Sequence, residues 1–127
     1  MRFLRDNHFS PRHVQMLRLY DFPVAALRDE FPDKVKDVEW LPELKGTDWI
    51  VVTCDRHIQT RKTEARALRA SGVSAVFINS FFTNLGLMPK GVWLLRHWTK
   101  IVAWAESASP PSYCQVRQNG QITPVDL

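Results

Sequence analysis

The amino-acid sequence predicts an α/β fold built around a mostly parallel central sheet. Short apolar segments rich in β-branched residues alternate with segments whose apolar residues recur at helical spacing, and this alternation is typical of βαβ units. The clearest strand is the continuous apolar run 49–53, of the kind that is buried on both faces of a parallel sheet. The final segments, which flank Asn119-Gly120, indicate a C-terminal β-hairpin.

The expected elements follow one another without an internal repeat or a low-complexity tract. In order, they are a strand at 1–5, a helix from Ser10 to Phe22, a short strand at 24–27, a short helix from Asp37 to Gly46, the strand 49–53, a basic helix from Thr60 to Gly72, a strand at 73–78, a long helix from Pro89, and a hairpin of 113–118 and 121–126.

Capping residues and helix breakers set the elements of the first half. Ser10-Pro11 begins the first helix, because serine caps N–H groups and proline fits the first turn. Phe22-Pro23 ends it. Asp37 can cap the next, short helix, which stops at Gly46, although Pro42 fits poorly inside it.

The same signals order the second half of the chain. Thr60 can cap a basic helix that ends at Gly72. Pro89 opens the longest helix, whose apolar residues lie on one face. The two-residue turn Asn119-Gly120 closes the hairpin, and Pro124 places the last strand at a sheet edge.

Size and composition indicate one soluble globular domain over residues 1–127. Of the 127 residues, 45% are apolar and 24% charged, and about two thirds of the surface can be buried at this length. No apolar run approaches the ~20 residues that cross a bilayer, and the N-terminus has no secretory signal. We therefore expect a cytoplasmic protein that does not cross a membrane. Cys54 and Cys114 indicate free, buried thiols, since no zinc-ligand spacing occurs.

Polar residues follow the predicted strands at positions where a sheet can bring them together. Asp6, Asp55 and Asn79 each follow a strand, and parallel strands deliver such residues into one crevice. Two neighbouring carboxylates stay ionised only when a cation neutralises them, and Mg²⁺ or Mn²⁺ takes oxygen ligands. A third acid, Asp37 or Glu39, would complete a site that activates water.

Each of these acids also has a purely structural interpretation. Asp6 can form a turn or cap before the first helix, and Asp37 can be a helix N-cap. Asp55 can be a loop acid paired with Arg56. His57 lies close enough in sequence to Asp55 to take part in the same site.

Charge is distributed unevenly along the chain. Residues 28–48 hold seven acidic and four basic side chains, whereas residues 56–69 hold five basic side chains and one acidic one. One interpretation is an acidic metal site flanked by a surface that attracts phosphate. The other is two ordinary solvated faces.

Three segments carry a family resemblance. Arg2-Phe3-Leu4-Arg5-Asp6-Asn7-His8 with Ser10-Pro11, Asp37-Val38-Glu39-Trp40, and Val51-Val52-Thr53-Cys54-Asp55-Arg56-His57-Ile58 resemble the compact PIN-like domains of VapC-type toxins, over about residues 1–80. The long helix and hairpin of 88–127 lie outside this match. The resemblance implies a three-layer α/β/α fold, an acidic pocket for Mg²⁺ or Mn²⁺, and endoribonuclease activity restrained by a cognate antitoxin.

The resemblance also implies roles for individual residues. Asp6 and Asp55 would be metal ligands, and Asp37 or Glu39 the third acid, with the other orienting water. We take Asp37 as the third ligand and count all four acids as catalytic. Arg5 departs from the family pattern, because an apolar residue is usual there, and no fourth acid is evident.

The leading hypothesis is a metal-dependent RNA endonuclease of toxin–antitoxin type. Its phosphate contacts, which do not read sequence, would come from Arg56, Lys62, Arg66 and Arg69. A degenerate PIN-like module that binds RNA or a partner protein is the alternative, and a DNA nuclease with the same chemistry is a third option. The tryptophan-rich helix and hairpin either pack as ordinary core, cover the sheet edge, form a homodimer surface or receive an antitoxin.

Overall fold

Six strands form one sheet in the computed structural model of the chain, which describes residues 1–6, 9–34 and 36–127. The strands are β1 (Arg2–Arg5), β2 (Val24–Ala26), β3 (Trp49–Thr53), β4 (Ala75–Ile78), β5 (Tyr113–Val116) and β6 (Ile122–Pro124). Their order in the sheet is β2-β1-β3-β4-β5-β6, and every neighbouring pair is parallel except β5 with β6. The predicted, mostly parallel sheet with its C-terminal hairpin is confirmed.

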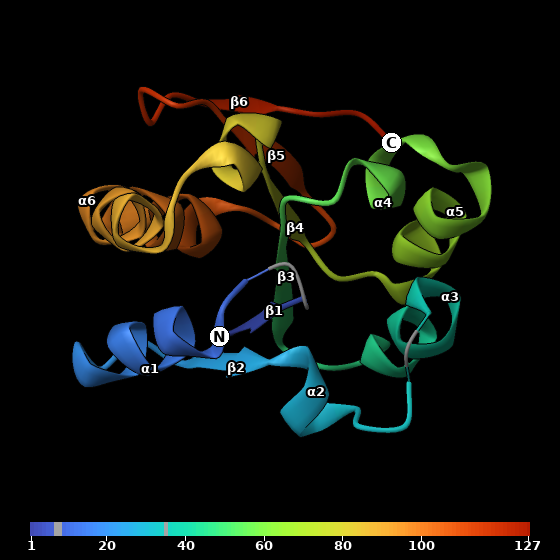
Figure 1. Ribbon diagram of the computed structural model, residues 1–127. Coiled ribbons are helices and arrows are strands. Elements are labelled where there is room, and N and C mark those ends of the chain that lie inside the picture. Colours follow the sequence, from blue (N-terminus) through green and yellow to red (C-terminus); the bar gives the residue numbers. More distant parts are fainter. Residues whose placement is uncertain (7–8, 35) are drawn as a thin grey trace.

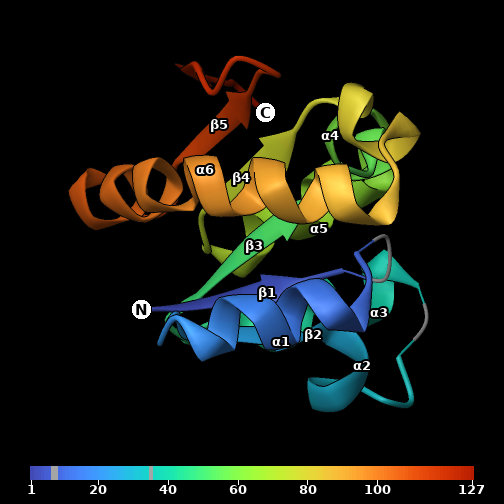
Figure 2. The ribbon, with the colours of Figure 1, turned by 60° about the vertical axis from the view of Figure 1, so that its left-hand side comes forward.

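Helices cover both faces of this sheet (Figures 1 and 2). They are α1 (Pro11–Leu19), α2 (Leu27–Glu30), α3 (Asp37–Trp40), α4 (Arg56–Thr60), α5 (Lys62–Ser71) and α6 (Leu87–Ser107), with the 3-10 turns η1 (Leu41–Leu44) and η2 (Ser80–Asn84). The helices α1 and α6 lie on one face, and α3, α4 and α5 on the other. This is the three-layer α/β/α arrangement that the sequence predicts. None of the described helices is long and apolar enough to span a bilayer.

Alternate residues of β1 face two separate hydrophobic cores. Phe3 packs on the α1 and α6 side, edge-on to Trp98 at 5.2 Å between ring centroids. Leu4 packs on the other side with Trp40 of α3. Because Trp93 and Trp98 of α6 are also buried, core packing is the confirmed interpretation for these two tryptophans.

The strand order places a crevice at the carboxyl ends of β1 and β3. From β1 the chain moves outward to β2, then returns past β1 to form β3 on its other side. In open α/β sheets, ligands bind where the strand order reverses in this way. Asp6 follows β1, and Asp55 lies two residues beyond β3, so both acids reach this switch point.

The helix predicted from Asp37 to Gly46 is divided into two short elements. Asp37–Trp40 is α-helical, and Leu41–Leu44 continues as a 3-10 turn. Pro42 has no N–H to donate to an α-helical bond, so the helix tightens there. The N-cap position belongs to Lys36, so the prediction that Asp37 caps this helix is wrong.

Thr60 does not cap the basic helix. It is the last residue of α4, a short helix that the sequence analysis did not predict, and its hydroxyl donates to the Arg56 carbonyl at 2.8 Å. Arg61 occupies the N-cap position of α5 instead, and Gly72 ends α5 with a left-handed backbone at φ 74°. The predicted end of this helix is therefore confirmed and its predicted start is wrong.

The C-terminal hairpin closes through three residues rather than two. The Arg117 N–H donates to the Gln121 carbonyl at 3.0 Å, which leaves residues 118–120 in the connection. Gly120 has a φ of 87°, and a Cβ added there would overlap the His97 ring of α6. The hairpin is therefore packed directly against the long helix.

Candidate active site at the carboxyl edge of the sheet

The side chain at the end of β1 is held by the last residue of β3. Asp6 is 6% exposed, and Thr53 is fully buried. The Thr53 hydroxyl donates a hydrogen bond to the Asp6 carboxylate. The same hydroxyl oxygen accepts the Asp55 backbone N–H at 2.9 Å. One threonine thus links the two acids that the sequence analysis expected to be neighbours.

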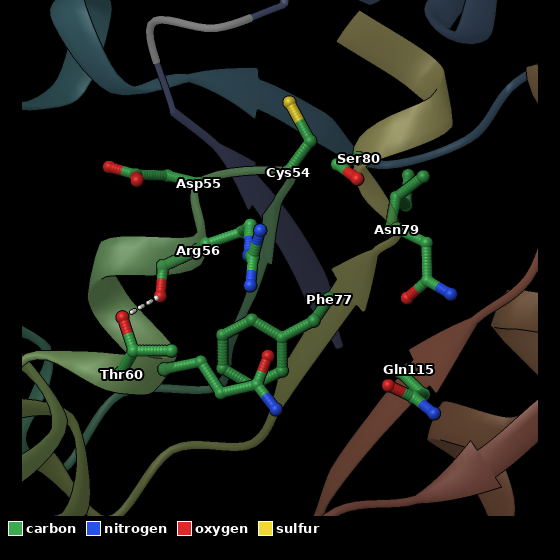
Figure 3. A pocket seen from close by; sticks show the side chains of 10 residues that line it. Cys54, Asp55, Arg56, Thr60, Phe77, Asn79, Ser80 and Gln115 are labelled. Carbon is green, nitrogen blue, oxygen red and sulfur yellow. Dashed lines mark hydrogen bonds between the residues drawn. The ribbon is translucent and has the colours of Figure 1, made fainter.

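Asp55 is the N-cap residue of the short helix α4. Its carboxylate accepts the backbone N–H of His57 at 2.9 Å, and its Oδ1 lies 3.3 Å from the His57 Nδ1. The Nε2 atom of His57 lies 3.3 Å from a guanidinium nitrogen of Arg61. Figure 3 shows the Asp55 carboxylate and the Arg56 guanidinium pointing in different directions. Asp55 therefore contacts His57, which in turn lies next to Arg61.

Arg5 supplies a buried cation beside Asp6. Its side chain is fully buried, one guanidinium nitrogen donates to the Ser10 carbonyl at 3.0 Å, and the guanidinium lies 4.4 Å from the Phe9 ring centre. Its Nε and Nη1 have no hydrogen-bond partner within residues 1–6, 9–34 and 36–127. Burial lowers the pKa of Arg5 to about 9, an effect that the charge of Asp6 opposes. The position that departs from the family pattern is thus an internal counter-charge.

Asp37 and Glu39 both have structural contacts at the start of α3. The Asp37 carboxylate accepts the indole N–H of Trp40 at 3.2 Å, and Glu39 accepts the Lys36 backbone N–H at 3.5 Å. Trp40 is fully buried and anchors α3 on the face of β1. In the described part of the chain, no three His, Cys, Asp or Glu side chains form a group that could hold a metal. Thr53 thus connects the Asp6 carboxylate to the Asp55 backbone, and among the described residues no third acid joins them in a group that could hold a metal.

A pocket of about 420 Å³ opens beside Asp55, between the carboxyl ends of β3, β4 and β5. Its lining residues are Cys54, Asp55, Arg56, Gln59, Thr60, Phe77, Ile78, Asn79, Ser80 and Gln115 (Figure 3). Asp55 and Asn79, which follow successive parallel strands, thus line the same crevice, as the strand-end argument predicts. Burial raises the pKa of the Cys54 thiol to about 12, so this cysteine is a neutral part of the wall.

The four basic residues expected to bind RNA fall into two groups. Arg56 lines the pocket. Lys62, Arg66 and Arg69 are exposed along α5. The row on α5 begins two residues after Thr60, which lines the pocket.

Sequence reasoning missed three side chains of this edge. Thr53 carried a signal, because a hydroxyl residue ends the strand two positions before Asp55. Gln59 and Gln115 carried none. Gln115 reaches the pocket only because β5 pairs in parallel with β4. The long helix α6 connects these two strands and brings the chain back to the same end of the sheet.

The donor groups at the switch point fit a divalent cation. Asp6 and Asp55 offer carboxylate oxygens, each able to accept several bonds, beside the hydroxyl of Thr53. Mg²⁺ is commonly held by one or two protein carboxylates together with waters and substrate phosphates. Carboxylate and hydroxyl oxygens are the donor types that Mg²⁺ and Mn²⁺ prefer.

Comparison with known proteins agrees with this geometry. Residues 1–80 match the family model described as PIN like domain, and these residues include β1 to β4 and every acid discussed above. Asn7 and His8 of the first motif, together with Val35, lie outside the described residues.

The chain has no significant match among curated proteins or solved structures. PIN-like domains are generally nucleases, which hydrolyse phosphodiester bonds. Since the match spans more than half of the chain, the chain belongs to the PIN-like domain family.

Proposed function

We propose that this chain is a metal-dependent endoribonuclease that cuts RNA at the edge formed by Asp6 and Asp55. The observation that carries the proposal is the Thr53 hydroxyl, which contacts the Asp6 carboxylate and the Asp55 backbone at once. In this proposal, the carboxylates of Asp6 and Asp55 hold the cation together, and the phosphate of the substrate completes its coordination. Membership of a nuclease superfamily supports the same conclusion.

Each residue of the edge has a stated task in this proposal. Asp6 and Asp55 hold Mg²⁺ or Mn²⁺, and Thr53 keeps the Asp6 carboxylate oriented. The bound cation supplies a Lewis acid that polarises the phosphate and lowers the pKa of a water. Arg56, which points across the neighbouring pocket in Figure 3, binds a phosphate oxygen.

The family resemblance adds the acids of α3. Asp37 is the proposed third ligand, and Glu39 orients water. Trp40 packs α3 against the face of β1, so this helix is attached to the strand that carries Asp6. The indole of Trp40 already fixes the Asp37 carboxylate.

The exposed row on α5 extends the RNA surface. Lys62, Arg66 and Arg69 are spaced three or four residues apart, so they share one helix face over about 10 Å. Contacts of this kind bind phosphates without reading bases. RNA affinity should therefore fall with salt, by a slope of about 0.7 for each phosphate neutralised.

We further propose a toxin–antitoxin role, with a cognate antitoxin as the protein partner. Met88, Val92 and Leu95 recur at helical spacing along α6 and are exposed, Met88 by 79%. An exposed apolar stripe of this kind supports a protein contact. A homodimer through the same stripe is the competing partner, which the mass of the isolated protein in solution distinguishes.

The test of the proposal is a calorimetric Mn²⁺ titration combined with an RNA cleavage assay. Asp6→Asn and Asp55→Asn should each lose saturable binding and cleavage while keeping the circular dichroism of the wild type. Asp33→Asn, an exposed turn acid, is the matched control and should behave as wild type. Cleavage of RNA by Asp55→Asn with Mn²⁺ would overturn the proposal, and equal cleavage of a matched DNA strand would make the chain a general nuclease.

A second function is favoured by Arg5. The buried Arg5 directly precedes Asp6 in the chain, and the two opposite charges attract each other. The alternative is therefore a degenerate PIN-like module that binds RNA or a protein without cutting. Binding of RNA that EDTA leaves unchanged, with no cleavage in Mn²⁺, would establish this alternative.

A further inference from the structure

We propose that the pocket between the ends of β3, β4 and β5 receives one unpaired nucleobase of an RNA strand, next to the phosphate at Asp55. This inference rests on the proposed ribonuclease function. It assigns to the same edge a subsite that chooses among RNA sequences, whereas the basic row on α5 contacts only the backbone.

The size of the pocket suits a single nucleoside. Its volume is about 420 Å³, near the lower end of the ~300–1,000 Å³ that small-molecule sites occupy. A duplex cannot enter a space of this size, but one base rotated out of a single strand can. RNA recognition by sequence depends on such unpaired, splayed bases.

The polar lining suits the edge of a base. Three side-chain amides line the pocket, those of Gln59, Asn79 and Gln115, and all three are half-buried. An amide offers both a donor and an acceptor. Base edges carry the same mixture, so the three amides can pair with one.

The remaining walls suit the faces of a base. Phe77, which is 4% exposed, contributes an apolar ring to the pocket lining. Figure 3 shows the Arg56 guanidinium directed across the space toward the side on which Asn79 and Gln115 lie. Unpaired bases stack on aromatic rings and on guanidinium planes. The pocket thus provides an apolar surface, a flat cation and amide groups around one cavity.

The pocket is also placed correctly for the chemistry. Asp55 lies in its wall, and Arg56 is the next residue in the chain. The face of the Arg56 guanidinium would stack on the base while its N–H groups bind the phosphate, so a base held between Arg56 and Gln115 would bring its own phosphate to the carboxylate edge. A choice of base in this pocket would therefore become a choice of the bond that is cut.

The experiment measures RNA binding in EDTA, where no cleavage interferes. The affinity of a labelled ribohexamer is measured by fluorescence anisotropy, and then that of hexamers with one abasic nucleotide at each position in turn. We expect one position at which loss of the base weakens wild-type binding about tenfold or more. Changing that base among A, C, G and U should also change the affinity.

Two pocket variants and one control complete the design. In Gln115→Leu and in Gln59→Leu, the sensitivity to the abasic position should disappear, while circular dichroism confirms folding. Gln15→Leu, at an exposed glutamine of α1, should keep the sensitivity of the wild type. Equal tolerance of every abasic hexamer, sensitivity that persists in both pocket variants, or no binding of any hexamer would overturn the inference.

Cleavage in Mn²⁺ is measured separately, so that the two proposals fail in different ways. If loss of one base weakens binding but the RNA is never cut, the proposed nuclease function is refuted and the proposed base pocket is retained. An RNA that is cut without any sensitive position would refute the pocket alone.

Discussion

The buried hydroxyl of Thr53 donates a hydrogen bond to the carboxylate of Asp6, although the two residues are 47 positions apart in the sequence. The same hydroxyl accepts the backbone N–H of Asp55 at 2.9 Å. Because Thr53 ends β3 and Asp6 follows β1, the pairing of these strands sets the position of both acids. The two acids follow the strands, and the pairing of β1 with β3 therefore positions the candidate site.

Replacing Thr53 by valine should damage the site more than the size of the change suggests. In Thr53→Val, the Asp6 carboxylate and the Asp55 N–H each lose a partner, which should lower the free energy of unfolding by about 2 kcal/mol. Affinity for Mn²⁺ should fall at least tenfold, as is usual when a group that orients a ligand is removed. Urea unfolding and calorimetry measure the two effects.

Thr123 provides the matched control for that variant. Its buried hydroxyl has no partner within the described residues, so Thr123→Val should be neutral or slightly stabilising. Equal effects of the two substitutions would contradict the role given to Thr53.

Replacing Arg5 by methionine should make the fold depend on a cation. In Arg5→Met, the buried carboxylate of Asp6 loses its neighbouring positive charge, so we expect a loss of about 3 kcal/mol in EDTA. Added Mn²⁺ should recover part of this stability, raising Tm more than it does in the wild type. Arg5→Lys, which keeps the charge, should respond to Mn²⁺ as the wild type does. An identical Mn²⁺-induced shift in Arg5→Met and the wild type would show that Arg5 and the metal do not compete for Asp6.

Gly120→Ala should destabilise the contact between the hairpin and α6. At a φ of 87°, alanine is strained, and its Cβ would overlap the His97 ring. We expect a loss of about 3 kcal/mol from these two causes together. Gly46 has a similar φ of 80° with no atom within 4 Å of an added Cβ, so Gly46→Ala should show the backbone strain alone, about 1 kcal/mol. Equal losses at the two glycines, measured by urea unfolding, would exclude the proposed clash with His97.

Acid should destabilise the fold through two buried histidines. Burial lowers the pKa of His13 and of His97, and nearby basic side chains, Arg5 and Lys90 for His13 and Lys100 and Arg96 for His97, lower both further. The folded state therefore keeps these rings neutral, while the unfolded chain takes up protons below about pH 6.5. The free energy of unfolding should therefore decrease as the pH falls from about 6.5 toward the lowered pKa values of the two histidines.

Thermal unfolding at pH 7 and pH 5 tests this dependence. In His13→Gln, the amide can still donate to the Leu87 carbonyl that the ring contacts at 3.0 Å, and it does not titrate. The double variant with His97→Gln should lose less Tm between the two pH values than the wild type. An equal loss in both proteins would assign the acid sensitivity to other groups.

Local chemistry explains which parts of the fold were predictable. Ser10 caps α1 through its side chain, which accepts the Arg12 N–H at 3.2 Å, and this is the interaction that the Ser-Pro pair predicts. The run that forms β3 is buried at every position, as its unbroken apolar sequence indicates. Gly72 takes the left-handed backbone that ends α5. These features depend on a few consecutive residues, so the sequence displays them directly.

Features that depend on distant residues were not predictable in the same way. Nothing near Tyr113 indicates that β5 pairs in parallel with β4, since that contact forms only after the chain returns through α6. Arg5 stands where an apolar residue is usual in the family, and nothing in the nearby sequence indicates that its charged side chain is completely buried against Phe9. The switch-point argument placed Asp6 and Asp55 at one edge, but tertiary packing decided that Thr53 joins them.

The base pocket has one wall outside the family match. Residues 1–80 contain Asp6, Asp55 and Asn79, whereas Gln115 belongs to β5, beyond the matched segment. The groups that would break the RNA backbone and one of the groups that would choose the base are thus encoded in separate stretches of the gene. Substitutions in the C-terminal third could redirect such a nuclease to new targets while its bond-breaking machinery is inherited unchanged.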